Sequence, residues 1–76
     1  MVELRNHDDI LIALGNRIKQ LRLQKKIKQS HLALNCDMEK STLSKIENGK
    51  VNISYITLIR LSRGLEVSAG ELITSP

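Results

Sequence analysis

The stretch QSHLALNCDMEKSTLSKIENGK, residues 29–50, determines the fold that this sequence predicts. Its apolar residues recur at helical spacing in two short runs, and a polar segment separates the runs. Each run therefore predicts a short helix with one apolar face, and the small side chain of Ala33 favours a close crossing of the two helices. The positions expected to face the core are Leu32, Ala33, Cys36, Leu43 and Ile46.

The turn between these two helices and the outer face of the second helix carry further signals. Asp37 stands at the turn, and Asp tolerates left-handed backbone angles better than most residues do. The outward positions of the second helix can all form hydrogen bonds: Glu39, Lys40, Ser41, Thr42, Ser44 and Lys45. A helix-turn-helix with a polar outer face is the layout that reads base edges in the major groove of DNA.

The segment resembles the helix-turn-helix of the phage-repressor class, the xenobiotic-response-element family of small bacterial and phage regulators. Gln29 matches the opening Gln of that family, residues 32–33 match its Leu-Ala pair, and residues 44–50 match its Ser-x-Ile-Glu-x-Gly-Lys close. Arg22 matches the arginine of the preceding helix, and the similarity covers about residues 14–73. The departures are Asp37 in place of Gly, Lys28 and Glu39 in place of capping Ser or Thr, and Ile53 in place of Pro.

The chain is expected to be all-α and to form a compact five-helix domain of the phage-repressor type. Gly49 and Gly64 are expected to stop the third and fourth helices. Residues 1–7 are expected to form a flexible N-terminal extension, and residues 8–76 the helix-turn-helix domain. The expected helices cover residues 9–24, 29–35, 40–48 and 55–63, with a fifth that starts at the capping box of Ser68.

Length and charge restrict the function. A chain of 76 residues has room for one small domain, so no separate catalytic or effector domain is expected. Six basic residues and no acidic one lie between Arg17 and Lys28, within a formal net charge of +4. Alone, such a run is more often an ordinary solvated helix face, but beside a helix-turn-helix it indicates a face that binds a polyanion.

The sequence predicts no cofactor, no metal and no catalytic site. Cys36 falls at a core-facing position and is interpreted as a small buried apolar residue, while His7 and His31 have no partners at metal-ligand spacing. No nucleophile has a base beside it, so the protein is not expected to be an enzyme. No signal peptide or membrane span is present, which predicts a cytoplasmic protein with no membrane partner.

The resemblance implies a sequence-specific regulator of transcription that binds double-stranded DNA as a homodimer on a palindromic operator. The expected base-contacting residues are Glu39, Lys40, Ser41, Thr42 and Lys45. The expected phosphate-contacting residues are Arg17, Lys28, Gln29, Ser44, Asn48 and Lys50. The family pattern also brings Arg22 and Glu47 together as a structural ion pair.

Ile73 of the fifth helix is expected to lie with Leu72 against the core and is also a candidate for the dimer interface. Ile56 and Ile59 have no place on the inner stripe of the fourth helix and form the rest of the expected dimer interface. They equally fit a role as gap fillers beneath the N-terminal extension. Stand-alone members of the family include phage repressors, restriction-modification controller proteins and antitoxins. RNA polymerase or a toxin is therefore a further partner that the resemblance allows, and the alternative function is a protein-interaction module or antitoxin component with the same fold.

Overall fold

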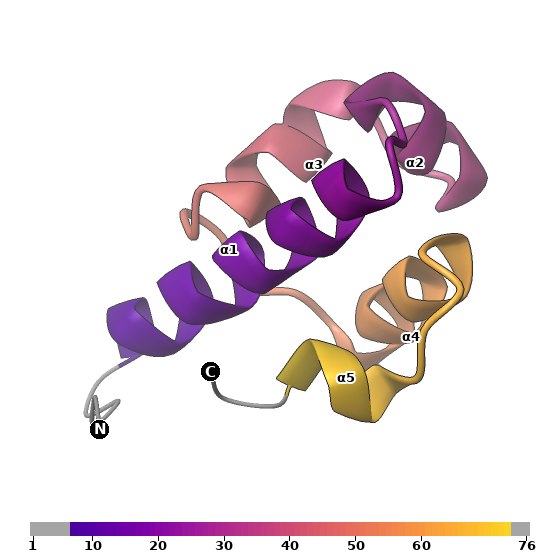
Figure 1. Ribbon diagram of the computed structural model, residues 1–76. Helices are drawn as coiled ribbons and strands as arrows, with labels where there is room; N and C mark the ends of the chain where they lie inside the picture. The colour runs from indigo at the N-terminus through magenta and orange to yellow at the C-terminus, as the bar shows by residue number, and fades with distance from the viewer. Residues whose placement is uncertain (1–6, 74–76) are drawn as a thin grey trace.

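The computed structural model describes residues 7–73, and this part of the chain consists of five helices with no strand (Figure 1). The expected all-α, five-helix fold is confirmed. Residues 1–6 of the predicted extension lie outside the described range, while His7, its last residue, begins the first helix. The helices are α1 (His7–Gln24), α2 (Gln29–Asn35), α3 (Lys40–Glu47), α4 (Tyr55–Gly64) and α5 (Ala69–Ile73).

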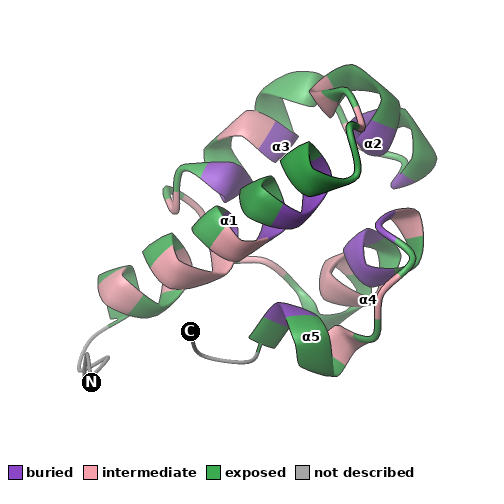
Figure 2. Cartoon of the chain, in the orientation of Figure 1, coloured by how far each residue is buried: buried purple, intermediate pink, exposed green. Residues whose placement is uncertain are grey.

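Every helix contributes to one apolar core, which lies where the purple segments of Figure 2 face one another. The five core-facing positions predicted within residues 29–50 are all buried, so the spacing of the motif identified them correctly. The remaining side chains of the core come from α1, from the end of α4 and from α5. The full set is Ile18, Leu21, Leu32, Ala33, Cys36, Leu43, Ile46, Leu61, Leu65 and Leu72.

Gly15 allows α1 and α3 to touch backbone to backbone. A Cβ atom at Gly15 would lie 2.2 Å from the carbonyl oxygen of Ile46 and 2.8 Å from that of Glu47. Any larger residue would therefore push α3 away from α1, because a backbone carbonyl cannot turn aside as a side chain can. The sequence pattern assigned Gly15 no role, yet it determines how closely the second helix of the motif sits against the body.

The first four helices end in the same way, at a residue with left-handed backbone angles. At the end of α4, Glu66 N donates to Arg63 O at 3.1 Å and Val67 N donates to Ser62 O at 2.9 Å. This pair of bonds is the Schellman motif, in which the left-handed position is most often Gly. The four left-handed residues are Lys26 (φ 58°), Asp37 (φ 56°), Gly49 (φ 71°) and Glu66 (φ 58°).

The helix ends confirm that Asp37 lies at the turn after α2 and that Gly49 stops α3. They correct the expectation that Gly64 is the residue that stops α4. Gly64 is the last residue of α4, and the residue that reverses the chain is Glu66, two positions later. Gly64 has a packing role instead, because a Cβ atom there would lie 2.8 Å from Leu32 Cδ1 and 3.0 Å from Cys36 Sγ. It allows α4 to approach α2 closely.

The helix starts divide into two kinds. Ser54 Oγ accepts a hydrogen bond from Thr57 N at 3.1 Å, and Ser68 Oγ accepts one from Glu71 N at 3.2 Å, so α4 and α5 have side-chain caps. Lys28 and Glu39 make no such bond at the starts of α2 and α3. These two short helices therefore depend on packing against the rest of the domain.

Candidate nucleic-acid interface

The exposed face of α3 is polar along its whole length. Leu43, Ile46 and Glu47 occupy the buried face of the helix. The residues predicted to read bases lie on the surface at the start and middle of the helix, and all five are exposed: Glu39, Lys40, Ser41, Thr42 and Lys45. The face thus offers hydroxyl, ammonium and carboxylate groups, which are the groups that pair with base edges.

Few of these polar groups are committed to partners inside the protein. Ser41 Oγ donates to Glu39 Oε2 at 3.4 Å, and both side chains are exposed. This long bond is at the weak end of the range, so either partner can exchange it for a bond to an external group. Ser44 is half-buried, and its carbonyl oxygen accepts from Asn48 Nδ2 at 2.9 Å.

A buried ion pair fixes the end of α3. Arg22 Nε donates to Glu47 Oε2 at 2.7 Å, and Arg22 Nη2 donates to Glu47 Oε1 at 3.1 Å, as the predicted pair requires. The same guanidinium donates through Nη1 to Ile27 O at 2.9 Å. Arg22 is 8% and Glu47 6% exposed, so both charges depend on each other for solvation.

Gln29, at the start of α2, completes this cluster. Its Nε2 donates to Glu47 Oε1 at 3.1 Å, so the amide that was predicted to contact a phosphate bonds to α3 in this structure. Glu47 therefore joins α1, α2 and α3 at one point. The carboxylate ties α3 to the N-terminus of α2.

The other predicted phosphate contacts lie around the ends of α2 and α3. Lys28 and Lys50 are exposed. The backbone N–H groups of the segment after α3 are already used, because Asn48 N donates to Ser44 O at 3.1 Å and Lys50 N donates to Lys45 O at 2.9 Å. This segment therefore presents side chains, above all the Lys50 ammonium, as its donors to an anion.

Arg17 is the predicted phosphate contact that the structure places elsewhere. Its Nε donates to the backbone oxygen of Glu71 in α5 at 3.0 Å. Residues two positions apart on a helix point to nearly opposite sides, so Arg17 faces α5 while Lys19 faces α3. In the sequence both residues belong to one run of basic residues, whereas in the structure their side chains lie on different sides of α1.

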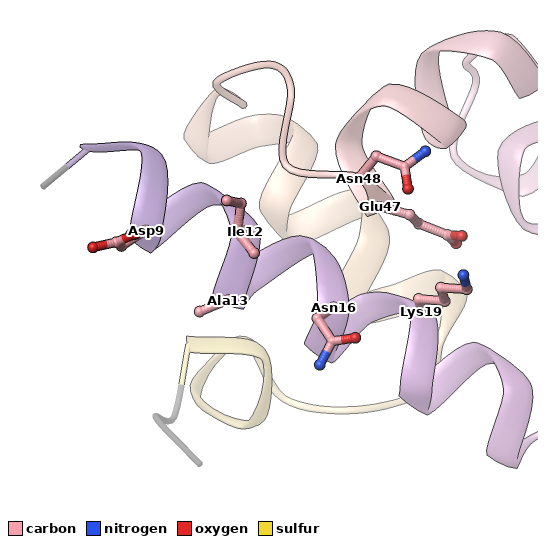
Figure 3. Close-up of a pocket in the computed structure, with 7 residues that line it drawn as sticks. All are labelled: Asp9, Ile12, Ala13, Asn16, Lys19, Glu47 and Asn48. Carbon is pink, nitrogen blue, oxygen red and sulfur yellow. The ribbon is translucent and has the colours of Figure 1, made fainter. Parts of the chain in front are cut away.

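An open groove of about 500 Å³ lies between α1 and the end of α3 (Figure 3). Lys19 stands at one end of it, and its side chain rises toward α3. Sequence reasoning did not single out Lys19, although it lies four residues after Gly15, which touches α3, and three before Arg22, which binds Glu47 of α3. The groove is lined by Asp9, Ile12, Ala13, Asn16, Lys19, Glu47 and Asn48.

The predicted dimer residues lie on α4 and α5. Ile56 is 63% and Ile73 is 64% exposed, so the expectation that Ile73 lies against the core beside Leu72 is wrong. Ile59 is half-buried and contributes less surface than expected. Tyr55 beside Ile56 is also exposed. Large apolar side chains therefore remain uncovered on these two helices of the single chain.

Cys36 behaves as a core residue, as predicted. It is 1% exposed, and its Sγ donates to Arg60 O at 3.4 Å. Burial raises the pKa of the Cys36 thiol, against a smaller lowering by the positive charge of Arg60. Across residues 7–73 no group of three His, Cys, Asp or Glu residues could hold a metal ion, and no helix is long and apolar enough to cross a membrane.

Comparisons with known proteins agree with this geometry. The family model described as helix-turn-helix matches residues 18–72. The chain is 38% identical over 68 residues to the control protein C.MunI of a Mycoplasma species, across 88% of this chain and 92% of that protein. It is 31% identical over 67 residues to the control protein C.BamHI of Bacillus amyloliquefaciens, across 87% and 83% of the two chains. The crystal structure of the restriction-modification controller protein C.AhdI from Aeromonas hydrophila superposes with a TM-score of 0.80 at 29% identity, across 82% of this chain and 94% of that one.

Proposed function

Because the chain belongs to the helix-turn-helix family of transcription regulators, whose model spans residues 18–72, we propose that it binds a palindromic operator as a homodimer. Helix α3 enters the major groove of each half-site, and its exposed polar residues read the base edges. The observation that carries this function is the wholly polar, exposed face of α3, held in place by the buried pair of Arg22 and Glu47.

The genes under control are proposed from the relatives. C.MunI, C.BamHI and C.AhdI are controller or control proteins, and C.AhdI is one of a restriction-modification system. This chain covers most of each of them, and we propose the same role for it: control of the genes of a restriction-modification system. A contact with RNA polymerase or with a toxin stays a prediction from the family resemblance.

The alternative of a protein-interaction module gains no support from the surface of α3. Such a module would present apolar side chains on the outer face of this helix, whereas Leu43 and Ile46, its two apolar residues, are both buried. Both amino groups, Lys40 and Lys45, are exposed on that face instead. These charges suit a polyanion better than an apolar protein groove.

The test is a selection of bound duplexes from a random pool, followed by footprinting of the selected site. We expect a palindromic consensus with half-sites about 34 Å apart, one turn of the double helix. We also expect a match to it upstream of genes for a restriction endonuclease or a DNA methyltransferase. A selection that enriches no sequence would contradict the proposed function, and a consensus near other genes would contradict the proposed role.

A further inference from the structure

We propose, on the basis of the DNA-binding function proposed above, that Lys19 of α1 contacts the phosphate backbone of the operator beside the recognition helix. Lys19 is exposed at the end of the groove between α1 and α3, in the wall opposite Asn48 (Figure 3). The first helix then takes part in binding directly, in addition to supporting α3 from behind.

The charges around the groove leave Lys19 available for an anion. Glu47 lies in the groove wall, but its two carboxylate oxygens accept bonds from Arg22 and Gln29. Its negative charge is therefore matched by the Arg22 guanidinium. Among the described residues, no hydrogen bond or ion pair engages the Lys19 ammonium, while Asp9 lies at the other end of the groove.

The groove lies beside the end of α3, so the Lys19 ammonium lies at the edge of the polar face that is proposed to read bases. Asn48 directly follows α3 and lies three residues after Lys45, so the two are neighbours on the same helical surface. A duplex that admits α3 into its major groove brings the phosphates that border that groove against both sides of the helix. Lys19 stands on the side of α3 that faces α1, where a phosphate of the bordering strand is expected.

Arg17 provides a matched control within the same helix. It carries the same charge two residues away, but its Nε donates to Glu71 O on the α5 side. Removal of either residue lowers the net charge of the protein by one. A difference between the two variants in DNA binding therefore reports position and not total charge.

The experiment compares wild type, Lys19→Ala, Lys19→Arg, Arg17→Ala and Lys45→Ala on the selected operator and on a scrambled duplex, at several salt concentrations. For Lys19→Ala we expect an equal loss of affinity on both duplexes, a salt slope lower by about one unit and an unchanged melting temperature. Lys19→Arg is expected to keep the wild-type dependence of affinity on salt concentration. Arg17→Ala is expected to keep that dependence as well, and to lower the melting temperature.

Three results would overturn the role of Lys19. The first is that Lys19→Ala binds both duplexes with the affinity and the salt dependence of the wild type. If Lys45→Ala still loses its preference for the operator, the proposed function would stand without the Lys19 contact. The second is a loss on the operator alone, because Lys19 would then contact a base. The third is a lowered melting temperature with an unchanged slope, which would make Lys19 a structural residue. Failure of the wild type to prefer the operator would instead remove the proposed function, and this inference with it.

Discussion

Both carboxylate oxygens of Glu47 accept hydrogen bonds, and the donors come from two other helices. A buried ion pair of this kind adds little net stability compared with apolar residues of the same shape, but the loss of one partner leaves the other charge buried and unpaired. The main effect of the pair is therefore to hold α3 in position against its neighbouring helices, and its net contribution to stability is small. Glu47 ties α3 to α1 and α2 through a single side chain.

Glu47→Ala is expected to destabilise the folded domain by about 3 to 5 kcal/mol, because the Arg22 guanidinium keeps only its bond to Ile27 O. Glu71→Ala serves as the control, since the Glu71 side chain is exposed. Thermal melting of both variants measures the difference. Equal shifts for the two would show that the ion pair contributes nothing particular to the fold.

Among the elements, the contact of α1 with α3 depends on the absence of a side chain at Gly15. Gly15→Ala is expected to destabilise the domain by about 3 kcal/mol, because the added methyl group would meet the Ile46 carbonyl. Gly70→Ala is the matched control, since the nearest atom to a Cβ there is Ser68 Oγ at 3.7 Å. It is expected to stabilise α5 by about 0.5 to 1 kcal/mol. Urea unfolding of both variants tests the contrast, and a neutral Gly15→Ala would mean that α1 and α3 can separate without loss.

The outer face of α3 carries a second prediction at this scale. Lys45→Ala and Ser41→Ala are expected to lose about 1 to 3 kcal/mol of binding on the operator and little on a scrambled duplex, because they remove proposed base contacts. Lys50→Ala removes a proposed phosphate contact and is expected to weaken binding to both duplexes alike. Titrations at two salt concentrations separate the cases. Equal losses on both duplexes for all three variants would rule out α3 as the reader of sequence.

The motif was predictable from sequence because its residues act through local spacing. Leu32, Leu43 and Ile46 recur at helical intervals, and such intervals place apolar side chains on one face whatever the rest of the chain does. The cap at Ser68 was predictable for the same reason, since its acceptor and its donor, Glu71 N, lie three residues apart.

Other features of the fold depend on contacts between segments far apart in the sequence. The spacing of apolar residues along the chain does not describe such contacts. Gly15 carries no side chain, so an apolar pattern passes over it although two helices meet there. Gly64 looked like a helix stop because Gly is common at helix ends, whereas its neighbours Leu32 and Cys36 explain its size. Arg17 and Lys19 belong to one run of charge, and only the arrangement of α5 and α3 distinguishes them.

At the scale of the whole molecule, one helix of eight residues reads too few base pairs to select a site in a genome, so the proposed function requires two copies that act together. The exposed large apolar residues of α4 and α5 are Tyr55, Ile56 and Ile73. Ile56→Glu is expected to convert the dimer into a monomer in sedimentation, because it places a charge within the proposed interface. The high exposure of Ile56 means that the variant still folds.

Leu34→Glu is the control for this prediction, because Leu34 is an exposed apolar residue on α2, a helix that carries none of the proposed interface residues. It is expected to leave the dimer intact. A dimer that survives both Ile56→Glu and Ile73→Glu would show that another surface joins the subunits. A wild-type protein that sediments as a monomer with and without operator DNA would remove the dimer altogether.

Substitutions at the left-handed residues that follow the helices could raise the thermal stability of the protein. Lys26, Asp37 and Glu66 adopt angles that cost a residue with a side chain about 1 to 2 kcal/mol, whereas Gly adopts them freely. Asp37→Gly and Glu66→Gly are each expected to add about 1 kcal/mol net of the extra freedom of the unfolded chain, and to raise the melting temperature by about 4 to 8 °C. Because the two turns are separate, their gains should add in the double variant, which calorimetry can measure. Asn52→Gly, at an exposed position with no left-handed angle, should bring no such gain. A natural sequence that fills three of four such turns with side chains is therefore well short of its attainable thermostability.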